Sequence, residues 1–104
     1  MEFCHYILDD EHNPVVCDLM TWGMWKQSDE GWRVKQETLP NGRWVSTVFL
    51  GIDHGFGDGP PVLFETMVFP NEDDFSELDC ERYCTWAEAE EGHKALVEKW
   101  LREA

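Results

Sequence analysis

Two apolar runs on either side of a glycine- and proline-rich segment constrain the fold more than any other feature of this chain. Residues 43–52 (RWVSTVFLGI) and 62–69 (VLFETMVF) carry apolar side chains at both odd and even positions. A strand with one solvated face alternates apolar and polar residues, so these runs predict central strands that are buried on both faces. Phe49 and Phe64 are therefore predicted core residues. Glu65 must reach a rim or find a partner, because an unpaired buried carboxylate is costly.

The segment before the first run predicts a hairpin. Residues 32–38 (WRVKQET) alternate uncharged and charged side chains, which is the period-two pattern of a strand with one wet face. Residues 39–42 (LPNG) predict the turn, since Pro40 presets φ and either Asn41 or Gly42 can accept a positive φ. Together with the two apolar runs, this hairpin makes three consecutive strands of one antiparallel sheet.

Both ends of the chain supply further elements. Residues 3–8 and 15–17 are predicted to form a strand and a short return strand, and Asp18 is placed to N-cap a helix over residues 19–27. That helix is apolar nearly all round, which predicts that other elements cover it on more than one side. Residues 85–88 (TWAE) match a capping box and begin a C-terminal helix with apolar residues at helical spacing.

These elements predict an α+β fold in a single domain of residues 1–104. We expect an antiparallel sheet of four or five strands, the last near residues 81–84. The C-terminal helix should pack on one face of that sheet, with a short helix near the N-terminus. A chain of 104 residues with 42% hydrophobic residues and six Trp is large enough to bury one core.

The net charge of −14 restricts the classes of partner. Surfaces that bind nucleic acids or anionic membranes are rich in Lys and Arg, whereas this chain has 8 basic and 22 acidic residues. Residues 53–81 hold nine acidic residues and neither Lys nor Arg. This segment could bind a basic partner or mimic the charge of nucleic acid, and the alternative is a solvated face that promotes solubility. The candidate binding residues are Glu72, Asp73, Asp74, Glu77 and Asp79.

A second candidate site lies in the loop between the apolar runs. Asp53 and His54 follow the first run directly, and Asp58 lies among the glycines of residues 55–59. Loops on a rigid scaffold often carry binding groups, so a small molecule, a metal or the chemistry of a small enzyme could be centred here. The alternative is a structural loop in which the glycines adopt positive φ and the side chains bond the backbone.

No motif predicts a metal site, a cofactor or a catalytic nucleophile. Cys80 and Cys84 are four positions apart, about 13 Å in an extended segment, and zinc sites favour closer spacing. Cys17, His54 and His93 could supply a nucleophile and a base only if the fold brought them together. We therefore expect no metal and no cofactor, and a binding protein rather than an enzyme.

Membrane spans and signal peptides are not predicted either. No segment approaches the roughly 20 consecutive apolar residues that cross a bilayer. The N-terminal sequence MEFCHYILDDE lacks the positive and apolar regions of a signal peptide. We expect the protein to reside in the cytoplasm of the cell that makes it, where its four cysteines would be free thiols.

Three longer stretches carry a resemblance to a known family. Residues 6–22 (YILDDEHNPVVCDLMTW), 45–69 (VSTVFLGIDHGFGDGPPVLFETMVF) and 81–93 (ERYCTWAEAEEGH) resemble a family of small bacteriophage and prophage proteins with no established activity. The resemblance covers most of the chain and implies a phage origin, with the host cytoplasm as its location. It implies no catalytic residues.

Phage accessory proteins of this size and acidity often bind host proteins, including defence proteins. The expected function is therefore a non-enzymatic acidic protein-binding module that modulates or inhibits a host protein with a basic surface. We expect neither direct nucleic-acid binding nor membrane binding.

Overall fold

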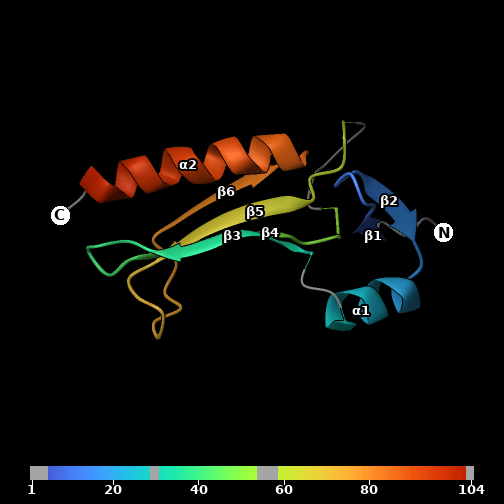
Figure 1. Cartoon of the computed structure of the whole chain (residues 1–104), viewed down its shortest axis with the longest axis horizontal. Coiled ribbons are helices and arrows are strands. Elements are labelled where there is room, and N and C mark those ends of the chain that lie inside the picture. Colours follow the sequence, from blue (N-terminus) through green and yellow to red (C-terminus); the bar gives the residue numbers. More distant parts are fainter. Residues whose placement is uncertain (1–4, 29–30, 54–58, 103–104) are drawn as a thin grey trace.

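The computed structural model describes residues 5–28, 31–53 and 59–102, which form an α+β fold (Figure 1). In chain order the elements are β1 (His5–Leu8), β2 (Pro14–Cys17), α1 (Leu19–Ser28), β3 (Arg33–Thr38), β4 (Trp44–Phe49), β5 (Phe64–Phe69), β6 (Asp79–Tyr83) and α2 (Trp86–Arg102).

The strands form two sheets. β3, β4, β5 and β6 make a four-stranded antiparallel sheet in that order, so the two apolar runs supply the central strands as predicted. β1 and β2 pair with each other in a separate two-stranded sheet. The first strand therefore lies outside the main sheet, and the chain adopts a positive φ of 75° at Gly51, just after β4. The Tyr6 amide then bonds the Gly51 carbonyl at 2.7 Å and joins the two sheets.

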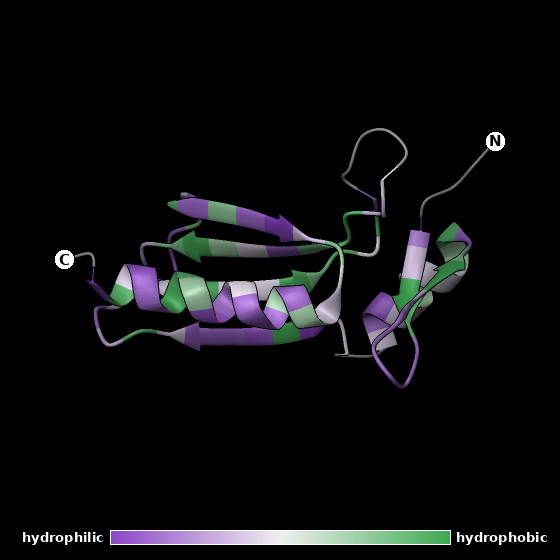
Figure 2. Ribbon diagram, turned by 90° about the horizontal axis from the view of Figure 1, so that it is seen from above, coloured by the Kyte–Doolittle hydropathy of each residue, from purple (hydrophilic) through white to green (hydrophobic). Residues whose placement is uncertain are grey.

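The main core lies between the four-stranded sheet and α2. Figure 1 and Figure 2 show α2 running along one face of this sheet. Phe49 and Phe64 are fully buried beneath it, with ring centroids 5.1 Å apart, so both predicted core residues are confirmed. Glu65 points to the opposite face, because successive strand residues alternate, and it accepts a 3.0 Å hydrogen bond from Nε of Arg82. This partner compensates for the low exposure of the carboxylate.

The hairpin turn and the close approach of α2 each depend on a glycine. The Gly42 amide bonds the Leu39 carbonyl at 2.8 Å, and the positive φ of the turn, 93°, falls on Gly42 rather than Asn41. In α2, a β-carbon at Gly92 would overlap the ring of Tyr83 on β6. The absence of a side chain at Gly92 therefore allows the helix to lie close to the sheet.

The N-terminus of α2 has the predicted capping box. The Glu88 amide donates to the Thr85 hydroxyl at 3.1 Å, and the Glu88 carboxylate accepts from the Thr85 amide at 3.2 Å. The same carboxylate oxygen also accepts from the Cys84 amide at 3.0 Å. The Glu88 amide in the first turn and the two amides just before the helix, of Cys84 and Thr85, are thus bonded to side chains.

Replacing Thr85 by Ala should lower the free energy of unfolding by about 1 kcal/mol, because the Glu88 amide loses its acceptor. Thr85→Ser keeps the hydroxyl and should lose less than half as much. Urea melts of the three proteins at one pH would measure the difference. Equal stability of the Ala and Ser variants would remove the side chain of Thr85 from the cap.

α1 differs from expectation in its surroundings. Asp18 accepts a 2.8 Å hydrogen bond from the Thr21 amide at the start of the helix. Trp22 and Trp25 attach α1 to the rest of the protein: the Trp22 indole donates to the Leu50 carbonyl at 3.2 Å, and Trp25 meets the ring of Phe49 edge-on. None of the helix residues is buried, so the prediction that other elements cover α1 on several sides is wrong. The short strand β1 and the end of the main sheet contact one side of the helix and leave the other exposed.

Candidate functional site

The acidic candidate residues lie in, or directly after, the loop of residues 70–78 between β5 and β6. This loop hangs below the sheet in Figure 1, on the face opposite α2. Glu72, Asp73 and Glu77 are exposed, and Phe75 between them has a ring that is 71% exposed. An aromatic side chain among carboxylates can contribute apolar contact area while the charges attract a basic partner.

Three of the acidic candidates accept hydrogen bonds within the protein. Oε2 of Glu72 accepts one from Oγ1 of Thr38 at 2.9 Å. Asp74 accepts a 2.9 Å hydrogen bond from the Ser76 amide within the loop. Asp79 accepts from Nζ of Lys99 at 2.8 Å and from the Trp100 indole at 2.9 Å. The hydrogen bond from Lys99 is the main cause that holds the pKa of Asp79 below its ordinary value. Asp79 therefore ties the start of β6 to the last turns of α2.

The alternative site in the glycine-rich loop has one member that the structure places. Oδ1 of Asp53 accepts a 2.9 Å hydrogen bond from the Val62 amide, so this side chain holds the two ends of the loop together. His54 and Asp58 lie outside the described residues. The geometry of Asp53 matches the structural role considered for this loop, in which side chains bond the backbone.

Five exposed apolar side chains gather on β2 and α1, which lie together at one end of the molecule (Figure 1, Figure 2). Met20 is 75% exposed and Met24 is 64% exposed, and they lie one helical turn apart on the same side of α1. We call this set the hydrophobic surface: Val15, Val16, Leu19, Met20 and Met24. Exposed apolar side chains gathered at one end of a molecule can mark an interaction site, and flexible Met side chains adapt to varied partners.

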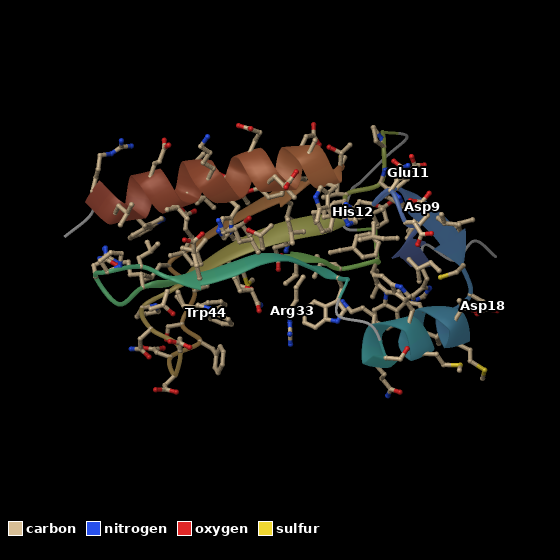
Figure 3. The ribbon with its side chains drawn as sticks, in the orientation of Figure 1. Asp9, Glu11, His12, Asp18, Arg33 and Trp44 are labelled. Atoms are coloured by element: carbon tan, nitrogen blue, oxygen red, sulfur yellow. The ribbon has the colours of Figure 1, made fainter. Side chains whose placement is uncertain are left out.

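Carboxylates lie at the same end of the molecule as the hydrophobic surface. Asp9, Asp10 and Glu11 are exposed in the turn between β1 and β2, and Asp18 is exposed where α1 begins (Figure 3). The Thr21 amide is the main cause that lowers the pKa of Asp18, so this carboxylate stays charged. Residues 5–25 contain neither Lys nor Arg. This end of the molecule therefore combines exposed apolar side chains with negative charge.

Sequence reasoning missed this surface, although its signal was present. Residues 19–25 (LMTWGMW) are apolar around most of the helix. A helix of this kind is usually covered by other elements on several sides. The neighbouring strands β1 and β2 have four residues each, too few to cover a second side. An apolar helix that its own chain cannot cover indicates an interaction surface.

A chain of buried polar side chains crosses the sheet beneath α2. The Tyr83 hydroxyl donates to Oγ1 of Thr66 at 3.2 Å, and Oγ1 of Thr66 lies 2.5 Å from Oγ1 of Thr47. Nδ1 of His93 lies 2.6 Å from Oγ1 of Thr47, and its Nε2 lies 2.6 Å from Oε2 of Glu37. An ionised carboxylate only accepts hydrogen bonds, so His93 donates to Glu37 through Nε2. The chain links β6, β5, β4, α2 and β3.

The order Thr47–His93–Glu37 resembles a nucleophile, a base and an orienting carboxylate, but its burial prevents catalysis. A nucleophile must reach the reacting atom of a substrate. Thr47 and Thr66 are both fully buried, and His93 is 3% exposed. The arrangement instead satisfies polar groups in the core and fixes the rotation of the His93 ring.

A groove of about 340 Å³ opens between β3 and α2, beside these hydrogen-bonded side chains. Glu37 and His93 form part of its lining, and the side chain of Glu37 is 32% exposed. Nζ of Lys35 lies 3.6 Å from Oε2 of Glu37. The complete lining comprises Val34, Lys35, Glu37, Glu90, His93, Lys94 and Val97.

The carboxyl group of Glu37 should contribute to the acid sensitivity of the fold. Its hydrogen bond to His93 is the main cause that lowers its pKa in the folded protein. A lowered folded pKa stabilises the protein above the unfolded value of about 4.3, and this stabilisation is lost as the pH falls through the folded pKa. Glu37→Gln keeps an acceptor for His93 but cannot titrate.

The free energy of unfolding of Glu37→Gln should therefore fall less between pH 7 and pH 3 than that of the original protein. Denaturant melts across this range would measure both slopes. Glu98→Gln, which changes an exposed glutamate on the outer side of α2, is the control and should leave the slope unchanged. Identical slopes for all three proteins would contradict the role of the Glu37 carboxyl.

The three cysteines that the structure describes are not arranged as a metal site. Cys17, Cys80 and Cys84 are free thiols, and burial is the main cause that raises the pKa of Cys80 to about 11. Among the described residues, no group of three or more His, Cys, Asp or Glu side chains is arranged to hold a metal ion. Within the same residues, neither helix combines the length and apolar character that a membrane crossing requires.

The geometry thus offers two exposed surfaces for a partner and one groove. One surface is the acidic loop of residues 70–78, on the face of the sheet opposite α2 (Figure 1). The other is the hydrophobic surface on β2 and α1, at one end of the molecule. Comparison with protein-family models, with curated proteins and with solved structures finds no match to this chain.

Proposed function

We propose that this protein is a non-enzymatic protein-binding module, of bacteriophage or prophage origin, that modulates or inhibits a host protein in the host cytoplasm. The hydrophobic surface of Val15, Val16, Leu19, Met20 and Met24 is the observation that carries this proposal. Exposing these side chains to water opposes folding and solubility, and a partner would relieve that cost by burying them.

The charge around the hydrophobic surface indicates the chemistry of the partner. Exposed carboxylates lie at the same end of the molecule, and residues 5–25 hold no Lys or Arg. A matching partner presents an apolar patch ringed by Lys and Arg, because complementary charges at an interface rim favour encounter and exclude wrong partners. The acidic loop of residues 70–78 would add long-range attraction to the same basic partner, and could imitate the charge of a nucleic-acid backbone.

The buried state of Thr47 supports a binding role over an enzymatic one. Thr47 has a histidine base 2.6 Å away but no access for a substrate. Asp53, in the loop considered as an alternative site, bonds the Val62 amide. Thr47 is out of reach of a substrate, and Asp53 acts as a hydrogen-bond acceptor for the backbone.

A paired capture experiment tests the proposed function. The original protein and the double variant Leu19→Asp/Met20→Asp would be immobilised and exposed to lysate of a bacterial host. We expect one host protein to be retained in near-stoichiometric amount by the original protein and lost with the variant. Circular dichroism of the variant would show that the fold is intact. If both baits retain the same proteins, the hydrophobic surface does not bind them.

Charge reversal in the acidic loop tests the steering role. Replacing Glu72, Asp73 and Glu77 by Lys should slow association with a basic partner by about tenfold at low salt, because rim charges act mainly on the association rate. The dissociation rate should change much less. Stopped-flow or surface-plasmon measurements at two salt concentrations would show the effect and its screening.

The control for this reversal is a matched triple variant on α2, Glu90→Lys/Glu91→Lys/Glu98→Lys, on the side of the sheet away from the loop. The logarithm of its association rate constant should fall by less than half of the fall seen with the loop variant. Equal slowing by both variants would show that net charge acts without regard to position, and would remove the loop as a binding surface.

A further inference from the structure

We propose that the groove between β3 and α2 is a binding site for a guanidinium or alkylammonium group carried on a short apolar stem. The site is separate from the hydrophobic surface: the groove is lined by β3 and α2, whereas the hydrophobic surface lies on β2 and α1. It does not depend on the proposed function. Its volume of about 340 Å³ is at the lower end of ligand pockets, which suits a small group.

The hydrogen bonds around Glu37 fix its carboxylate before any ligand arrives. Nε2 of His93 lies 2.6 Å from Oε2, and the ring of His93 is itself held by Thr47 at 2.6 Å from Nδ1. Side chains fixed in this way lose little conformational freedom on binding, which favours affinity. The lowered pKa of Glu37 keeps the carboxylate charged near neutral pH.

One oxygen of Glu37 remains available in the groove. The contacts of Glu37 with His93 and Lys35 both involve Oε2. Oε1 makes no hydrogen bond to any residue within 5–28, 31–53 and 59–102, and it is not a buried atom. A carboxylate oxygen only accepts, so the ligand group that completes it must be an N–H or O–H donor. A cationic N–H donor makes the stronger, charge-assisted bond.

The rest of the lining fits the stem and the charge of such a ligand. Val34 and Val97 provide apolar contact from the strand and from the helix. Glu90 adds a second carboxylate on the helix side. Lys35 and Lys94 also line the groove, and Lys35 is 63% exposed, so its side chain can turn toward solvent when a cation binds.

The two lysines provide a directional test of ligand charge. If the ligand is a cation, removing Lys35 relieves repulsion and binding should tighten by about two- to fivefold, the size of a surface ion pair. If the ligand were a carboxylate or phosphate, the same change would weaken binding. Removing the charge of Glu37 should do the reverse: it should weaken the binding of a cation and strengthen the binding of an anion.

Nuclear magnetic resonance titration would detect binding through shifts in the signals of the Val34 and Val97 methyl groups and of the His93 ring. The probes are butylguanidinium, butylammonium and, as the anionic control, pentanoate. Capped arginine methylamide distinguishes an arginine side chain of a protein from a free small amine, because it adds two peptide groups that must fit at the rim. We expect saturable shifts with the cations, confined to the groove, and none with pentanoate.

The variants decide the outcome. Glu37→Gln should weaken butylguanidinium binding by about tenfold or more, as expected for loss of a charge-assisted hydrogen bond. Glu90→Gln changes an exposed side chain and should weaken it by about two- to fivefold, which keeps the test informative if Glu37→Gln is unstable. Glu98→Gln, outside the groove, should leave binding unchanged. No shift at about 100 mM cation, tighter binding of pentanoate, or weaker binding in Lys35→Gln would overturn the proposal.

Discussion

Replacing Phe49 by Ala should lower the free energy of unfolding by about 3–5 kcal/mol. The ring is fully buried and meets Phe64 at 5.1 Å and Trp25 at 5.7 Å between centroids. Its removal would leave a cavity where the main sheet meets α1, and the rigid strand on each side of it limits collapse into the space. The loss is a large share of the total stability of a small domain, which is about 5–15 kcal/mol. Guanidinium melts followed by Trp fluorescence would measure it.

Phe75→Ala is the matched control, because it removes the same ring from an exposed position. Phe75 touches Phe69 and Trp44 edge-on but is 71% exposed, so its loss should be about 1 kcal/mol or less. If the two variants lost similar amounts, the assignment of Phe49 to the core would fail.

The variant Leu19→Asp/Met20→Asp should weaken binding to an isolated partner by at least about 100-fold, since apolar side chains at the centre of an interface contribute about 1–2 kcal/mol or more each when they are truncated. Both positions are more than half exposed, so the variant should keep the stability of the original fold. Isothermal titration calorimetry of the purified pair would give the affinity, and a negative heat-capacity change would report apolar burial.

Leu101→Asp provides the control for this second prediction. Leu101 is an exposed leucine at the end of α2, far along the chain from the hydrophobic surface. It should leave the affinity within about twofold of the original. An equal loss in both variants would mean that added negative charge, rather than the hydrophobic surface, determines binding.

A second copy of this chain is a poor occupant of the hydrophobic surface. Each copy carries a net charge of −14, and exposed carboxylates at this end of the molecule would repel those of a second copy. A partner with Lys and Arg around an apolar patch removes this repulsion. Sedimentation equilibrium at low and high salt would detect self-association of the protein if a second copy does occupy the hydrophobic surface.

Local causes made much of the fold predictable. The central strands β4 and β5 follow from apolar side chains on both faces, and the turn before β4 follows from the φ preferences of Pro40 and Gly42. The cap of α2 requires a hydroxyl at Thr85 and a carboxylate three residues later. Each of these causes acts within a few residues, so the sequence alone contains all that is needed.

The candidate site was less predictable, because its members meet through long-range contacts. Asp79 has the same appearance in the sequence as Asp73, yet only Asp79 meets Lys99, twenty positions later. His93 lies in the last helix, and its partner Glu37 is 56 positions away on β3. Neither pairing leaves a local pattern, so charge counts could not separate structural carboxylates from available ones.

The amino-acid sequence by itself determined the type and order of the elements, the central position of β4 and β5, the turn chemistry and the net negative charge. The tertiary structure decided that β1 and β2 form their own sheet, that α1 remains exposed on one side, and that Glu37 is fixed by His93. The physical reason is that periodicity and backbone preference act between near neighbours, whereas burial depends on how much area the other elements can cover. Two four-residue strands could not cover the apolar residues of α1, and that shortage of area left the surface proposed here for a partner.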